Sequence, residues 1–112
     1  NIISTEIWDL ADLLPHWDEI ALRSWVTEGG TRILYQEAAL GTIMAPGDLI
    51  AFVQSKVEGP WADLLVYSGT VGTVGGALIF GDYFEVELYD PVIDRRLRCA
   101  YSISPLRYMR EV

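Results

Sequence analysis

The chain contains one cysteine and one histidine, too few for most sites that depend on these residues. A lone cysteine, Cys99, excludes a disulfide within the chain and is typical of a reducing compartment. The usual zinc sites need several His or Cys ligands, so we expect no metal site. Lys and Arg number only 8 against 16 Asp and Glu. Because phosphate binding needs clustered Lys and Arg, we expect no direct nucleic-acid binding.

Long apolar runs are also missing. No run approaches the roughly 18 residues that a helix needs to cross a bilayer. The first residues lack the basic flank and apolar centre of a signal peptide. From the sequence we therefore expect a cytoplasmic protein with no membrane contact.

Recognisable catalytic motifs are absent too. His16 stands at a predicted helix junction, which favours a structural or solvated role. The glycine run at residues 69–76 is not followed by the Lys-Ser or Lys-Thr pair of a phosphate-binding loop. Glu85 and Glu87 have arginines to pair with, which favours ion pairs over acid–base catalysis. We expect no enzyme activity, no catalytic residues and no cofactor.

The chain is rich in apolar and aromatic residues. Apolar residues make up 51% of its 112 residues, which predicts one folded domain over residues 1–112. Four Trp, six Tyr and three Phe give more aromatic surface than so small a core easily buries. Surplus aromatic residues concentrate in interfaces, so we expect self-association or a protein partner.

Charge is divided unevenly along the chain. Residues 1–94 carry 15 acidic and three basic side chains, whereas residues 95–112 carry five Arg and one Glu. An acidic body favours basic partners, but the same charge also keeps a small domain in solution. The charge alone does not distinguish these two roles.

The N-terminal part of the sequence predicts helix. Apolar residues recur three and four positions apart from Thr5 onward, with acidic residues near the start. Pro15 would end or kink a first helix and begin a second one. Gly29-Gly30 is typical of a helix end. We predict helix over residues 5–28, within a helical arm at residues 1–30. Its apolar stripe consists of Ile7, Leu10, Leu14, Trp17, Ala21 and Trp25.

Beyond the two glycines the pattern changes. Residues 31–36 are rich in β-formers and residues 37–40 could form a helical turn, so residues 31–45 stay open between strand and helix. From residue 46 onward, short β-like runs are broken by Gly, Pro and Asp, which predicts a small antiparallel β-structure over residues 46–112. The predicted strands lie at residues 49–53, 64–67, 70–74, 77–80, 83–89 and 97–103.

The last two of these runs predict a β-hairpin. Each alternates apolar and more polar side chains, so each strand has one side that faces the core. Joined by the loop between them, the strands would place Glu87 opposite Arg98, a favourable cross-strand pair. The predicted core-facing residues are Phe84, Val86, Leu88, Leu97, Cys99 and Tyr101.

A particular succession of segments runs through residues 46–112. It consists of Pro46-Gly47-Asp48-Leu49-Ile50, a long loop at residues 54–68, Ser68-Gly69-Thr70-Val71-Gly72-Thr73-Val74, Tyr83-Phe84-Glu85-Val86-Glu87-Leu88 and a closing turn at Ser104-Pro105-Leu106. This succession resembles small β-barrels of the Src-homology-3 type, including KOW-like and electron-transport accessory members. The resemblance implies a barrel with a docking function, and it carries no catalytic residues over.

The sequence as a whole predicts an α+β fold, in which the helical arm precedes a barrel-like part at residues 46–112. We expect a non-catalytic protein-interaction module or accessory subunit. One alternative is an acidic inhibitor or nucleic-acid mimic, possible for a phage-encoded protein, that occupies a basic site. A second alternative is a small ligand-binding barrel or an enzyme of unfamiliar type.

The expected contact surface lies on the helical arm. Trp8, Leu13 and Ile20 lie off the apolar stripe and would leave a second apolar patch on the surface. Asp9 and Asp12 contribute to an acidic face beside it. We predict that these five residues contact the partner.

Overall fold

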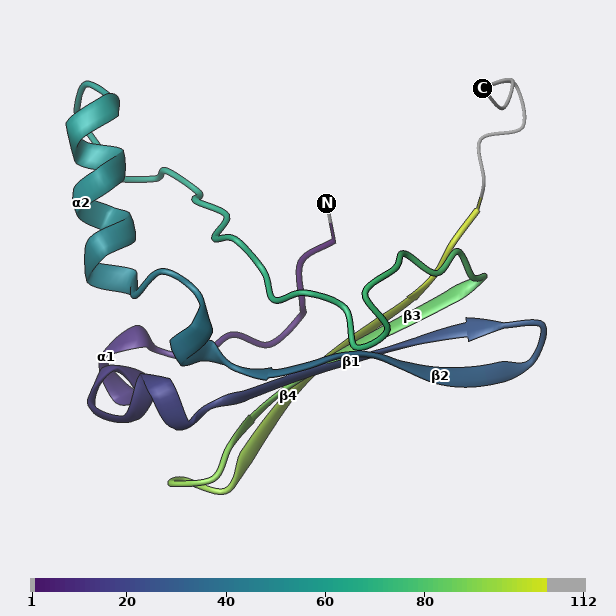
Figure 1. Cartoon of the computed structure of the whole chain (residues 1–112). Coiled ribbons are helices and arrows are strands. Elements are labelled where there is room, and N and C mark those ends of the chain that lie inside the picture. The colour runs from purple at the N-terminus through teal and green to yellow at the C-terminus, as the bar shows by residue number, and fades with distance from the viewer. Residues whose placement is uncertain (1, 105–112) are drawn as a thin grey trace.

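The computed structural model describes residues 2–104, which form a four-stranded antiparallel sheet with short helices beside one end (Figure 1). The helix α2 stands away from this sheet, and a long irregular connection returns from it (Figure 1). The predicted α+β class is confirmed. In chain order the elements are α1 (Leu10–Leu13), the 3-10 helix η1 (Leu14–Glu19), β1 (Ala21–Glu28), β2 (Thr31–Ala39), the 3-10 helix η2 (Leu40–Thr42), α2 (Pro46–Lys56), β3 (Tyr83–Asp90) and β4 (Arg95–Ser102).

The strands are ordered β2-β1-β3-β4, and every neighbouring pair is antiparallel. β1 and β3 are therefore central, whereas β2 and β4 form the edges. This sheet is open, so the barrel expected at residues 46–112 is not confirmed. Half of its strands come from the chain before residue 46. Of the predicted closing turn, Pro105 and Leu106 lie outside the described residues.

The helix predicted over residues 5–28 is wrong in its second half. Helical structure ends at Glu19, and β1 begins at Ala21. Within β1 the buried residues are Ser24 and Val26, with less buried neighbours between and beside them. This burial has the period of two that a strand with one covered face requires, instead of the helical period of 3.6.

The two glycines connect β1 to β2 and do not end a helix. Gly29 and Gly30 have φ values of 58° and 82°. Positive φ at both central residues is what the tightest hairpin turns need, and glycine adopts it without strain. The open question at residues 31–45 is resolved as strand up to Ala39, followed by η2.

The strand predicted at residues 49–53 is wrong, because these residues lie in α2. Pro46 begins the helix, Asp48 lies in its first turn and Lys56 in its last, an order that suits the helix dipole. A short apolar run fits a strand and a helix equally well. The residues at the two ends of this segment were the better indication of a helix.

The strands predicted at residues 64–67, 70–74 and 77–80 do not form either. The chain from Val57 to Asp82 contains no strand. Val74 N–H donates to the Tyr35 carbonyl oxygen at 2.8 Å, but no ladder continues from this contact. Four glycines between residues 69 and 76 favour turns over extended pairing here.

The β3–β4 hairpin is confirmed, including its register. Glu87 lies opposite Arg98, and Phe84 lies opposite Tyr101. The rings of Phe84 and Tyr101 are in contact, with centroids 5.5 Å apart. The six residues predicted to face the core share one face of the sheet, and all of them, Cys99 included, are partly buried.

The buried core lies where the helical turns meet the sheet. Leu13, Ile20 and Leu40 form its centre, with exposed fractions of 6%, 0% and 4%. Leu40 N–H donates to the Ile20 carbonyl oxygen at 2.8 Å, which joins the start of β1 to the end of β2. Partly buried Trp8, Trp17, Leu22, Ile43 and Leu88 pack around this centre.

A buried glutamine attaches the long connection to the sheet. Gln36 Oε1 accepts a hydrogen bond from the Ser24 hydroxyl at 2.8 Å. Its Nε2 donates to the Val71 carbonyl oxygen at 2.7 Å and to the Thr70 hydroxyl at 3.3 Å. Val71 itself is buried. Because a buried amide is costly to leave unpaired, Gln36 fixes the position of residues 70–71.

Gly81 gives a test of how closely this connection approaches β1. A Cβ at Gly81 would collide with the Thr27 carbonyl oxygen and with Val26 Cγ1. Asp82 N–H donates to the same carbonyl at 2.9 Å, so moving the backbone away would break a hydrogen bond. We expect Gly81→Ala to lower the free energy of unfolding by about 2 kcal/mol, measured by urea unfolding. Gly75→Ala is the control, because its Cβ would meet nothing within 4 Å. Equal stability of the two variants would contradict the close approach.

Candidate functional site

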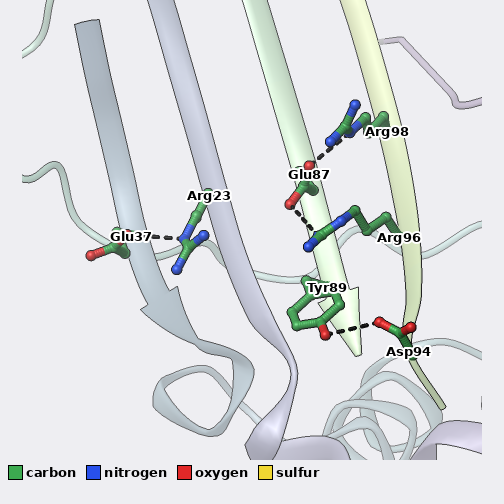
Figure 2. A network of polar contacts seen from close by, with 7 residues as sticks. All are labelled: Arg23, Glu37, Glu87, Tyr89, Asp94, Arg96 and Arg98. Atoms are coloured by element: carbon green, nitrogen blue, oxygen red, sulfur yellow. Dashed lines mark hydrogen bonds and ion pairs between the residues drawn. The ribbon is translucent and has the colours of Figure 1, made fainter. Parts of the chain in front are cut away.

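The polar face of the sheet carries a row of alternating charges across all four strands. Glu37, Arg23, Glu87 and Arg98 are consecutive cross-strand neighbours on β2, β1, β3 and β4. Arg23 Nε lies 3.0 Å from Glu37 Oε2, and Arg98 Nε lies 2.7 Å from Glu87 Oε2 (Figure 2). Opposite charges at neighbouring positions favour this register over any shifted one.

Glu87 is the buried member of the row, with an exposed fraction of 5%. Besides Arg98 it pairs with Arg96, whose Nη1 lies 3.5 Å from Glu87 Oε1. A buried carboxylate is tolerated only when it is paired and hydrogen-bonded, and two arginines meet that condition. The ion pairing predicted for this side of the hairpin is confirmed for Glu87. Glu85 pairs instead with Arg32 of β2, at 2.7 Å.

Two of the arginines lie over aromatic rings. The Arg32 guanidinium carbon is 4.1 Å from the Trp25 ring centroid, and that of Arg96 is 4.1 Å from the Tyr89 ring centroid. Such stacking is attractive and holds the planar guanidinium in one orientation. The Tyr89 hydroxyl donates to the Asp94 carboxylate at 3.0 Å, and this hydrogen bond raises the pKa of Tyr89 (Figure 2).

A second polar pair lies where β3 ends. Asp90 is fully buried, and the side chain of His16, from η1, has an exposed fraction of only 11%. His16 Nε2 and Asp90 Oδ2 are 2.5 Å apart. Asp90 Oδ1 accepts the backbone N–H of Val92 at 3.0 Å. The pair therefore joins η1 to the turn between β3 and β4.

The Asp90 carboxyl is held in its ionised form. Burial would by itself raise the pKa of Asp90, but hydrogen bonds from His16 and from the backbone N–H groups of Val92 and Ile93 lower it below the ordinary 3.8. Within residues 2–104, no hydroxyl or thiol hydrogen-bonds to His16. The geometry is that of a structural clamp between two segments.

Two further findings concern residues 2–104. In this range no three His, Cys, Asp or Glu side chains gather in a way that could hold a metal ion. None of the helices described there has the length and apolar character needed to cross a membrane.

The residues predicted to contact a partner are divided between core and surface. Leu13 and Ile20 are buried, with exposed fractions of 6% and 0%, so the surface patch expected from them is wrong. The chain leaves the regular helical path at η1, where His16 has a φ of −139°, and both residues turn inward. Trp8 packs against the same core.

The two acidic residues of that prediction are exposed. Asp9 is the N-cap of α1, because its side chain accepts the Ala11 N–H at 3.0 Å. Asp12 lies in the first turn of this helix, where a negative charge suits the dipole. Both carboxylates have this local role, and both remain accessible from solvent.

The largest group of exposed apolar side chains lies at residues 46–80, which we call the apolar arm. The sequence predicted short strands and a long loop here, and the contact surface was expected on the helical arm instead. Trp61 Nε1–H donates to the Val57 carbonyl oxygen at 2.8 Å and so folds the arm back at the end of α2. The exposed large apolar side chains of the arm are Ile50, Phe52, Val57, Trp61, Leu64, Leu65, Val66, Tyr67, Val74, Leu78 and Phe80. Met44, two residues before the arm, is exposed as well.

A family model described as "Protein of unknown function (DUF2848)" matches residues 1–101. The chain belongs to this family. The matched range contains the apolar arm and all of the sheet except Ser102 at the end of β4. No curated protein and no solved structure shows significant similarity to the chain.

The buried Asp90 carboxylate should make stability depend on pH. Asp90→Asn removes the ionised partner of His16, and we expect it to lower the free energy of unfolding at neutral pH by about 2 kcal/mol. Because the folded pKa lies below the ordinary value, the carboxylate stabilises the fold above about pH 4 and loses this effect as the pH falls further. The difference between wild type and variant should therefore stay constant from neutral pH down to about pH 4 and shrink as the pH falls further, as urea unfolding would show.

Asp94→Asn is the matched control for this measurement. It removes a carboxylate from the neighbouring turn, but Asp94 is exposed. Asparagine also tolerates the positive φ of 49° at this position. We expect a much smaller loss of stability than for Asp90→Asn. A wild-type advantage over Asp90→Asn that stayed constant down to acid pH would contradict the ionised clamp.

Proposed function

We propose that this domain is a non-catalytic protein-interaction module, and that the apolar arm is its contact surface. The observation that carries the proposal is the exposure of large apolar side chains along the arm. The exposed fractions of Phe52, Leu78 and Phe80 are 53%, 70% and 84%. Single exposed apolar residues are ordinary, but apolar patches built from many of them mark interaction sites.

The lack of packing between α2 and the sheet supports the same proposal. An isolated helix of 11 residues is marginally stable in water, and most helices depend on a packed apolar face. Among the described residues, α2 makes no extensive contact with the sheet. Ile50 and Val53 line a hollow with Trp61 and Leu64 of the following segment. A partner that covers this surface would give α2 the packing that the domain itself does not supply.

We further propose that a second copy of the chain binds the apolar arm, which makes the module a homo-oligomer or an accessory subunit. Asp9 and Asp12 are exposed beside partly buried Trp8, and these acids would attract a basic partner. The lone cysteine supports a reducing compartment, and we place the module in the cytoplasm.

Phe52→Asp tests the role of the arm. The substitution puts a charge into the exposed apolar surface of α2, and aromatic residues at interfaces commonly contribute about 2 kcal/mol or more. We expect the native protein to sediment above the monomer mass, and the variant to associate at least about tenfold more weakly. Sedimentation velocity over a range of protein concentrations measures this effect.

Ala51→Asp is the control, because it adds the same charge at the neighbouring exposed position of the same helix. It should leave association nearly unchanged. Equal weakening by the two variants would contradict the assigned surface, and a native protein that stays monomeric at every concentration would contradict self-association. Association that salt abolishes while Phe52→Asp does not would instead favour an acidic mimic of nucleic acid.

A further inference from the structure

The polar face of the sheet concentrates positive charge in a chain whose net charge is −8. Lys and Arg occur at six positions among residues 2–104. Four of these side chains line a single shallow depression of about 340 Å³, and only two carboxylates share the lining. The local charge is therefore opposite in sign to that of the whole chain. The charged residues of the lining are Arg23, Arg32, Arg96 and Arg98, with Glu85 and Glu87.

We propose that this depression binds a small anion with two charged groups, carboxylate or phosphate, held between Arg23 and Arg98. These arginines are on β1 and β4, on either side of Glu87 in β3. Two strand spacings separate their Cα atoms by roughly 10 Å. Arg23 pairs with Glu37 and Arg98 with Glu87, so the two guanidiniums are held by different strands, and an anion with a charge at each end can reach both.

The arginines keep hydrogen-bond donors for such a ligand. Arg32 and Arg98 donate to their glutamates through Nε, each at 2.7 Å. The closest approach of Arg23 to Glu37 is also through Nε. Since a guanidinium has five N–H donors, the terminal amino groups remain to bind carboxylate or phosphate oxygens. Arg98 is the most accessible of the four, with 71% of its side chain exposed.

Neighbouring side chains orient all four arginines before any ligand arrives. Arg23 pairs with Glu37, and Arg98 pairs with Glu87. Arg32 is stacked on Trp25 and Arg96 on Tyr89, so two guanidiniums are already held in place. The small side chain of Ala100 leaves room in the lining. Groups fixed in advance lose little conformational freedom on binding, which favours affinity. The Glu87 charge opposes an anion, but Arg96 and Arg98 already balance it.

The experiment titrates the full chain with pyrophosphate and, separately, with succinate at low salt. Calorimetry measures the affinity, and the Nε–Hε signals of ¹⁵N-labelled arginine report which side chains respond. We expect saturable binding of at least one dianion, with shifts at Arg23 and Arg98. Acetate at matched ionic strength has one charged group and should bind at least about tenfold more weakly.

Arg98→Gln should weaken the binding at least about tenfold, while Arg96 still pairs with the buried Glu87. Arg95→Gln is the control, because it removes the same charge from the same strand but Arg95 does not line the depression. It should change the affinity by less than about twofold. Circular dichroism checks that both variants are folded, and Arg23→Gln replaces Arg98→Gln if the latter is not.

Several outcomes would overturn the proposal. Absence of saturable binding by either dianion is one, and acetate binding as tightly as the dianions is another. Equal loss in Arg98→Gln and Arg95→Gln would mean general attraction to positive charge. Binding of an acidic peptide but of neither dianion would make this face a protein-docking surface instead.

Discussion

The pairing of β1 with β3 joins residues that are far apart in the chain, such as Trp25 and Glu85. Without it the protein would have two separate hairpins, β1–β2 and β3–β4, and an isolated hairpin is only marginally stable in water. With this pairing, the four strands form one sheet that has a charged face and a face toward the core. The charged row crosses this pairing between Arg23 and Glu87, and Gly81 approaches β1 just before β3 begins.

Buried polar contacts then attach the segments that have little apolar packing of their own. Gln36 holds the long connection at Val71, and Asp90 holds η1 through His16. Each contact is directional, and a shifted arrangement would leave a buried amide or carboxylate without a partner. In a domain whose fully buried core is small, these contacts select one arrangement of the connections, while the apolar cluster around Ile20 supplies the burial.

The sequence predicted the β3–β4 hairpin and its register, because alternation over seven residues is a local signal that both strands repeat. It did not predict β1, since steps of four residues, as from Ala21 to Trp25, fit a helix and also one face of a strand. The clamp between His16 and Asp90 joins residues 74 positions apart, and no local pattern announces it. The apolar arm was missed for a different reason: an apolar run does not say whether its own chain or another one covers it.

β4 is an edge strand, and three of its first four residues are Arg95, Arg96 and Arg98. An edge strand offers unpaired backbone groups to which a strand of another molecule can add. A second copy that added antiparallel along this half of β4 would bring arginines against arginines, and like charges directly opposite one another destabilise a ladder. The same side chains thus protect the sheet from growing by strand addition into an aggregate.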